Sequence, residues 1–101
     1  MSDRYVASMD PEPMTVAVIP AFRARATLRG VVAKALDVVD MVVVVDDACP
    51  EACGDTVRGM DSRVLVIRHE RNRGVGGATK TGIAHALELG ATYVVKIDAD
   101  G

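Results

Sequence analysis

The strongest constraint on the fold is an alternation of short, largely apolar runs with segments of helical periodicity. The run 41–45 is apolar at every position and stops at Asp46-Asp47. A strand that is apolar on both faces is typical of the middle of a parallel sheet covered on both sides. Runs at 16–19, 64–67 and 93–97 predict three more strands, the first of them closed by Pro20.

The segments between these strands predict helices. The first, with Thr27 as its N-cap, has an apolar stripe at spacings of three and four: Leu28, Val31, Val32, Ala35, Leu36 and Val39. The second is expected to open at 74–77 and to end before a left-handed cap at Gly90, with a buried face of Ala78, Ile83, Ala86 and Leu87. The turn-rich segment 50–59 holds at most a short helix. This β-α-β-(short α)-β-α-β order predicts an α/β fold, a parallel Rossmann-like sheet with helices on both faces.

Length and composition limit the class of protein further. The 101 residues form one domain at most, and a hydrophobic content of 50% excludes a disordered chain. We expect residues 1–13 to be a flexible leader that lacks the pattern of a signal peptide. No apolar run approaches the ~20 residues that span a bilayer, which predicts a cytoplasmic protein, compatible with a membrane-associated parent. The net charge is −2, and the arginines are spread among acidic residues, so the sequence has no basic patch of the kind that binds nucleic acid. For Cys49 and Cys53, two free thiols and a local disulfide are both open.

Ligands of such sheets bind outside the carboxyl ends of the strands. The polar or turn-forming segments at these ends are 20–22, Asp46-Asp47, the stretch from His69 to Gly74, and Asp98-Ala99-Asp100. Two acids one residue apart can bind Mg²⁺ or Mn²⁺ when phosphates supply the remaining oxygens. The turn 74–77 matches neither a Walker A loop nor a dinucleotide fingerprint because Thr79 interrupts both patterns, so phosphate contact and tight helix packing both stay open. His69 ends a strand near the proposed site but is not interpreted as a catalyst.

Four blocks in register carry a resemblance to a known family. They are Val18-Ile19-Pro20-Ala21-Phe22, Val44-Val45-Asp46-Asp47, the stretch from Arg68 to Ala78, and Asp98-Ala99-Asp100-Gly101. Together they resemble the family 2 glycosyltransferases of GT-A fold over residues 15–101. Within that family, the chain is similar to bacterial enzymes of the dolichyl- or undecaprenyl-phosphate sugar synthase type.

The resemblance implies a role for several residues. Asp47 would bond the nucleotide base, Asp98 the ribose, and Asp100 the Mg²⁺ or Mn²⁺ ion on the diphosphate. Two further groups would line or border the nucleotide-sugar pocket: Pro20, Ala21 and Phe22, and Arg73, Gly76 and Lys80. The implied function is the transfer of a sugar from a UDP- or GDP-type donor to an acceptor hydroxyl or a lipid phosphate.

The chain also departs from the family pattern. Phe22-Arg23-Ala24 stands where many members have Tyr-Asn-Glu, which would let Arg23 face the diphosphate. Ala48-Cys49-Pro50 replaces the usual Gly-Ser after Asp47. The family's catalytic base and acceptor site follow the metal motif. We therefore expect residues 14–101 to be the donor-binding half of a truncated domain, inactive alone and without a catalytic residue of its own.

Two other functions are weighed against this one. A severed sheet would expose its last strand as an edge, which predicts a non-catalytic, self-associating α/β module and a homo-oligomer. A receiver-like signalling domain shares the acid pair and the length. In that fold the acids follow the first strand, whereas here they follow the second.

Overall fold

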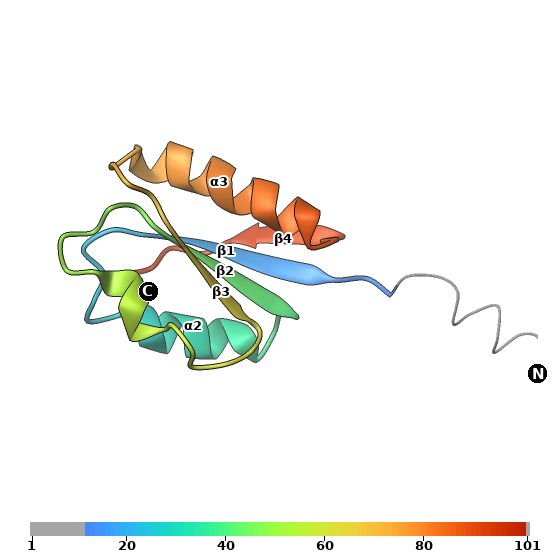
Figure 1. The fold of residues 1–101 in the computed structure, drawn as a ribbon. Coiled ribbons are helices and arrows are strands. Elements are labelled where there is room, and N and C mark those ends of the chain that lie inside the picture. The colour runs from blue at the N-terminus through green and yellow to red at the C-terminus, as the bar shows by residue number, and fades with distance from the viewer. Residues whose placement is uncertain (1–11, 101) are drawn as a thin grey trace, which may run out of the picture.

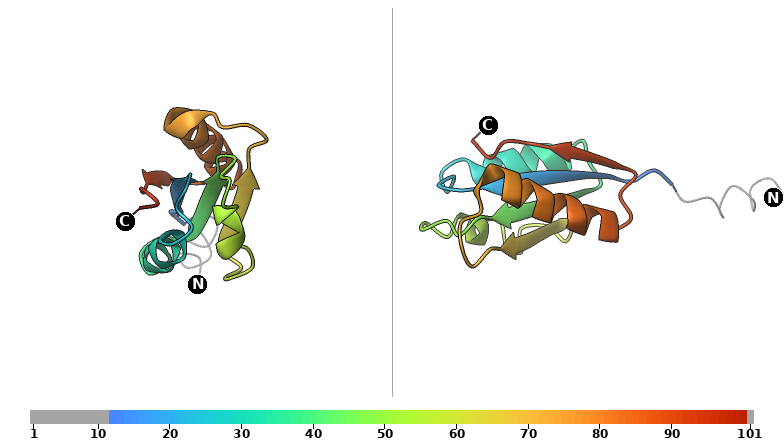
Figure 2. Two further views of the ribbon diagram at one scale, coloured as in Figure 1. Left: turned by 90° about the vertical axis from the view of Figure 1, so that its left-hand side faces the viewer. Right: turned by 90° about the horizontal axis from the view of Figure 1, so that it is seen from above.

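The computed structural model describes residues 12–100, so most of the predicted leader lies outside the described residues. The helices and strands, in chain order, are β1 (Thr15–Ala21), α2 (Leu28–Leu36), β2 (Met41–Asp46), the 3-10 helix η1 (Cys53–Thr56), β3 (Val64–Arg68), α3 (Gly74–Glu88) and β4 (Tyr93–Lys96). The four strands form one parallel sheet in the order β3-β2-β1-β4. The helix α3 covers one face, and α2 and η1 lie on the other (Figures 1 and 2). The predicted α/β fold with helices on both faces is confirmed.

Strand β1 is longer than the sequence predicts, because it continues through Pro20 to Ala21. Pro20 pairs with Val45 of β2. The carbonyl of Val18 accepts a hydrogen bond from the N–H of Ile97, on the β4 side of the strand. Pro20 lies two positions further along β1, so its nitrogen points to that same side. The ladder with β4 ends at Val18 and Lys96. The missing N–H of proline therefore falls where no neighbouring strand needs a donor.

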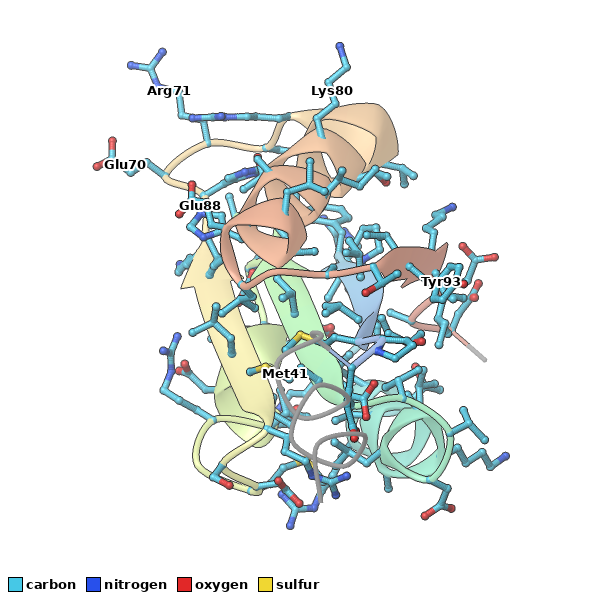
Figure 3. All side chains as sticks on the ribbon, turned by 90° about the vertical axis from the view of Figure 1, so that its right-hand side faces the viewer. Met41, Glu70, Arg71, Lys80, Glu88 and Tyr93 are labelled. Carbon is cyan, nitrogen blue, oxygen red and sulfur yellow. The ribbon has the colours of Figure 1, made fainter. Side chains whose placement is uncertain are left out.

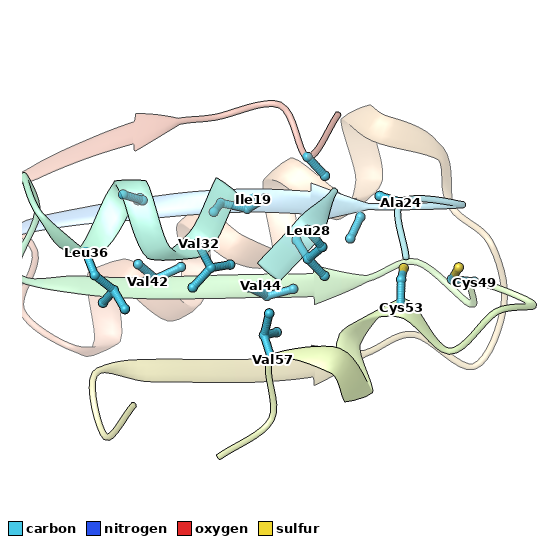
Figure 4. Packing of buried hydrophobic residues seen from close by; sticks show 14 residues of the cluster. Ile19, Ala24, Leu28, Val32, Leu36, Val42, Val44, Cys49, Cys53 and Val57 are labelled. Carbon is cyan, nitrogen blue, oxygen red and sulfur yellow. The ribbon is translucent and has the colours of Figure 1, made fainter. Parts of the chain in front are cut away.

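Side chains of the central strands alternate between two separate cores. On the α2 face, Ala17, Ile19, Val42 and Val44 pack with α2 and the segment around η1 (Figure 4). The α3 face is packed by Val16, Val18, Val43 and Val45, which contact α3. All eight side chains are fully buried. Strands buried on both faces explain why the sequence of β2 is apolar without interruption.

Helix α2 begins after Thr27, as predicted, but the Thr27 side chain does not cap it. The hydroxyl of Thr27 instead donates to the carbonyl of Ala99 at 2.8 Å. The helix ends at Leu36, and Val39 of the predicted stripe lies beyond that end, half-buried against the same core. Neither this helix nor any other in residues 12–100 has the length and apolar character needed to cross a bilayer.

The predicted buried face of α3 is only half right. Ala78 and Ala86 are buried, but Ile83 is 37% exposed and Leu87 is 61% exposed. The third buried residue is Gly82, midway between the two alanines. Small residues at intervals of four let the helix axis approach the sheet closely, which turns the larger side chains outward.

Gly90 adopts the predicted left-handed conformation, with φ of 94°. Its N–H donates to the Leu87 carbonyl, and the N–H of Ala91 donates to the Ala86 carbonyl. This pair of bonds is a Schellman motif, which satisfies carbonyls at the end of α3.

Candidate functional site

A cavity of about 650 Å³ lies at the carboxyl end of the sheet. It is lined by Pro20, Ala21, Phe22, Arg23, Ala24, Asp47, Asn72, Gly74, Val75, Ala78, Asp98, Ala99 and Asp100. These residues come from the ends of β1, β2 and β4 and from the start of α3. The structure therefore brings together six of the nine residues assigned to the site from the sequence.

The two acids at the end of β2 serve different faces of the sheet. Because side chains alternate along a strand, Asp46 turns toward η1 and Asp47 turns toward α3. The Asp46 carboxylate accepts hydrogen bonds from Cys49 N at 2.9 Å, Gly54 N at 3.0 Å and Arg68 Nη1 at 2.8 Å. It is fully buried and fastens the loop after β2. Asp47 is the acid that reaches the cavity.

Asp47 is held in place by partners from β3 and α3. Its Oδ1 accepts a bond from His69 Nδ1 at 2.8 Å and another from the backbone N–H of Arg73, also at 2.8 Å. Burial alone would raise the pKa of the Asp47 carboxyl, but the hydrogen bonds from His69, Arg73 and Gly74 outweigh it and lower that pKa. Asp47 is therefore an ionised, rigidly oriented carboxylate at neutral pH.

His69 is buried between Asp47 and α3, and its second ring nitrogen lies 2.8 Å from Thr81 Oγ1. The Thr81 hydroxyl also lies 3.1 Å from the Gly77 carbonyl. Its single proton serves one of these two acceptors, so the protonation of Nε2 decides which bond Thr81 makes. With Nδ1–H directed at Asp47, His69 links the acid to the first turns of α3.

The Asp98-Ala99-Asp100 segment continues the line of β4 past the end of the sheet. Ala99 is buried and its carbonyl accepts the Thr27 hydroxyl bond, while Asp98 and Asp100 are exposed and line the cavity. Asp98 Oδ1 lies 3.0 Å from Lys96 Nζ in a solvent-exposed pair, which holds it only weakly. A small, anchored middle residue thus directs both carboxylates toward the cavity.

Three residues assigned from the sequence do not line this cavity. Lys80 is exposed and extends from α3 away from the sheet (Figure 3). Gly76 is exposed on the first turn of α3. Arg73 contributes its backbone N–H to Asp47, and its side chain packs so closely over Gly77 that a Cβ there would lie 2.6 Å from Arg73 Cβ. Within the turn 74–77, close packing is thus seen at Gly77, whereas Gly74 and Val75 line the cavity.

A different cluster has the residue types of a metal site but not its chemistry. Ligand atoms of Asp46, Cys49 and Cys53 lie within 4.8 Å of one another. Both Asp46 oxygens already accept hydrogen bonds, from Cys49 at Oδ1 and from Gly54 and Arg68 at Oδ2, so the carboxylate already serves the loop after β2. Burial would raise the pKa of Cys49, but hydrogen bonds from the Cys53 thiol and from backbone N–H groups lower it. Burial raises the pKa of Cys53 to about 12. Both cysteines are free thiols, which agrees with one of the two alternatives left open by the sequence.

Comparison with known proteins identifies the chain. Residues 16–101 match the family described as glycosyl transferase family 2. The chain belongs to this family. Among its relatives is the UDP-N-acetylglucosamine–dolichyl-phosphate N-acetylglucosaminyltransferase of Methanococcus voltae, 59% identical over 39 residues, which cover 39% of this chain and 16% of that protein. The undecaprenyl-phosphate mannosyltransferase of Micrococcus luteus is 41% identical over 63 residues, covering 59% of this chain and 26% of that protein.

The fold of this glycosyl transferase family 2 chain also matches a solved structure. The crystal structure of S. aureus TarS 1–349 superposes with a TM-score of 0.69 at 19% identity, covering 86% of this chain and 27% of that one. At that identity the likeness concerns the fold alone, and the predicted GT-A arrangement is confirmed. The chain spans about a quarter or less of the length of each of these proteins. Family membership also decides against the receiver-like alternative.

Two members of this family 2 site, His69 and Asn72, lie in the stretch that the sequence places at this edge, but neither has a predicted role there. The Asn72 side chain donates to the Asp47 carbonyl at 3.3 Å. The missing information was the strand order. Once β2 and β3 are known to be neighbours with Asp46 opposite Arg68, Asp47 and His69 are the next residues along the same ladder and must meet.

Proposed function

We propose that the chain is the donor-binding part of a glycosyltransferase, which binds a nucleotide-diphosphate sugar together with Mg²⁺ or Mn²⁺. The observation that carries the proposal is the convergence of Asp47, Asp98 and Asp100 on one cavity. Membership of glycosyl transferase family 2 supports the reaction class. We propose residues 14–101 as this donor-binding unit and assign no catalytic base within them.

Each carboxylate has a role that fits its surroundings. Asp47 offers a fixed negative charge to an N–H of the base, because His69 and Arg73 bind only its Oδ1 and so orient the group. Asp98 binds the ribose hydroxyls, and the exposed Asp100 binds the metal. Hard divalent cations take few protein carboxylates when phosphates complete the coordination, which fits a site with one or two acids. When bound, the metal stabilises the negative charge of the departing nucleoside diphosphate.

The relatives support a particular pair of substrates. The names of the Methanococcus voltae and Micrococcus luteus proteins contain dolichyl-phosphate and undecaprenyl-phosphate, and the former also contains UDP-N-acetylglucosamine. We therefore propose a lipid phosphate as the acceptor of the whole protein, with a UDP- or GDP-type sugar as the donor. This acceptor places the reaction of the whole protein beside a membrane surface.

Calorimetric titration of UDP and GDP tests the proposal, with Mn²⁺ and with EDTA. Asp47→Ala is expected to weaken binding about tenfold or more in both conditions, because a hydrogen bond to a charged group is lost. Asp100→Ala is expected to weaken binding by a similar factor only in Mn²⁺, because this residue acts through the metal. Asp55→Ala, an exposed acid outside the cavity, is the control and should bind as the wild type does. Absence of measurable binding of both nucleotides to the wild type in Mn²⁺ would contradict the proposal.

The anchor of the metal segment gives a second test. Thr27→Val removes the hydroxyl that holds the Ala99 carbonyl while keeping the shape of the side chain. Loss of one such bond, worth roughly 0.5–1.5 kcal/mol, should lower the Mn²⁺ affinity of the nucleotide complex about fivefold. Binding in EDTA should weaken less, because only the contact of Asp98 with the ribose is then affected. Thr27→Ser keeps the hydroxyl and should match the wild type. Equal Mn²⁺ titrations for the valine variant and the wild type would show that the segment is positioned without this bond.

A further inference from the structure

Arg23 is the one lysine or arginine among the residues that line the described cavity, whose walls also carry three carboxylates. In residues 12–100 its guanidinium forms no ion pair. Other arginines are committed elsewhere: Arg58, Arg63 and Arg68 bond carboxylates, and Arg25 and Arg29 bond backbone carbonyls. Arg23 is thus a cation on the cavity wall that has no anionic partner within the described chain.

The backbone of Arg23 is held in an unusual conformation. Its φ is 54°, a left-handed value that costs energy for a residue with a side chain. The Arg23 N–H donates to Cys49 Sγ at 3.1 Å, and Cys49, which belongs to the loop after β2, is itself fully buried. The sulfur therefore stabilises a turn that would otherwise be disfavoured.

The side chain of Arg23 is also oriented. Its Cζ lies 5.3 Å from the centroid of the Phe22 ring, within the range of a cation–π contact. Phe22 lines the same cavity and is 42% exposed. An arginine that rests on an aromatic ring has lost part of its conformational freedom before any ligand arrives, so less entropy is lost when it binds one.

We propose that Arg23 binds the diphosphate of the donor, and that Cys49 is a positioning residue that acts through the Arg23 backbone. This inference rests on the proposed function and adds a second source of positive charge to it. The diphosphate of the donor gains a further negative charge as the sugar leaves, and that charge exceeds what one divalent ion neutralises. The planar guanidinium presents paired N–H donors that match two phosphate oxygens. Asp100 serves the metal, and Arg23 serves phosphate oxygens that the metal does not reach.

The test compares nucleotides with nucleosides. UDP, GDP, uridine and guanosine are titrated by calorimetry into the wild type, Arg23→Gln and Arg23→Lys, in Mn²⁺ and in EDTA. Arg23→Gln should weaken diphosphate binding about tenfold or more in both conditions and leave nucleoside binding unchanged. Arg23→Lys, which keeps the charge without the paired donors, should give an intermediate loss. Arg25→Gln, whose guanidinium bonds the Glu51 carbonyl and does not line the cavity, is the matched control and should bind as the wild type does.

The outcomes separate this inference from the proposed function. If the wild type binds UDP or GDP and Arg23→Gln binds it equally well, the role of Arg23 is wrong and the donor site stands. An equal loss of nucleoside and nucleotide in Arg23→Gln also overturns the role, because the effect is then not specific to phosphate. If the wild type binds neither UDP nor GDP, the proposed function fails together with the inference.

A double-mutant cycle tests the part assigned to Cys49. Cys49→Ala should weaken diphosphate binding in the wild-type background and have no further effect in Arg23→Gln, because the sulfur acts only through Arg23. Cys49→Ser, which keeps a hydrogen-bond acceptor, should recover most of the affinity. If the two substitutions lower the diphosphate affinity additively, the positioning role of Cys49 is wrong. Thermal unfolding of each variant verifies that it is folded.

Discussion

Replacing Asp46 with alanine is expected to lower the free energy of unfolding by about 2–6 kcal/mol, because two buried backbone N–H groups each lose their acceptor at a cost of about 1–3 kcal/mol. The Asp46 side chain is 1% exposed and accepts bonds from two backbone N–H groups and from Arg68. Removal of the carboxylate would leave the N–H groups of Cys49 and Gly54 buried without their acceptor. Gly54 packs closely against this carboxylate, since a Cβ there would lie 3.0 Å from Asp46 Oδ2 and 3.0 Å from Val66 Cγ1. Urea unfolding followed by circular dichroism measures the loss.

Asp55 provides the matched control for Asp46. It is also an aspartate paired with an arginine, Arg58, but its side chain is 63% exposed. Asp55→Ala should change the free energy of unfolding by less than about 1 kcal/mol, because exposed ion pairs contribute little. Asp46→Asn keeps one oxygen acceptor, so its loss in free energy of unfolding should lie between those of Asp46→Ala and Asp55→Ala. Equal stabilities of Asp46→Ala and Asp55→Ala would show that the loop after β2 does not depend on the buried carboxylate.

Adding a single methyl group to Gly82 is expected to lower the free energy of unfolding by about 1–3 kcal/mol, the usual cost of overpacking a core. A Cβ at this position would overlap Cγ1 of Val18, which is fully buried in the middle of β1. Val18 is β-branched and enclosed, so it cannot turn aside. The substitution Gly82→Ala must therefore push α3 away from the sheet. The expected loss reverses the ordinary preference of helices for alanine over glycine.

Two further variants identify the cause of this loss. Gly82→Ala combined with Val18→Ala should be more stable than the sum of the two single changes predicts, because the second change removes the overlapping methyl group. Gly30→Ala in α2, where nothing lies within 4 Å of the added Cβ, should stabilise the protein by up to about 1 kcal/mol. Additive effects of the Gly82 and Val18 substitutions would rule out the steric explanation. Thermal or urea unfolding is sufficient for all of these variants.

Much of the fold could be predicted because its signals are local. The continuous apolar run of β2 predicted a central strand, and the order of strands and helices predicted parallel pairing. The position of Gly90 was also correct, since a left-handed cap is decided by the residues at the helix end. In contrast, the buried face of α3 was wrong at Ile83 and Leu87. Helical periodicity gives the spacing of a face, but the distance between helix and sheet decides whether large or small residues occupy it.

The candidate site divides in the same way. The sequence by itself determined that acids follow β2 and β4 and that these strand ends share one edge, because parallel strands point the same way. Only the tertiary structure decided which acid serves which face, that His69 lies against Asp47, and that Thr27 holds Ala99 from 72 residues away. It also decided that Arg23 adopts a left-handed conformation and that its N–H donates to Cys49. Each of these contacts joins segments distant in the chain, and neither spacing nor periodicity within one segment encodes which distant atoms the folded sheet brings together.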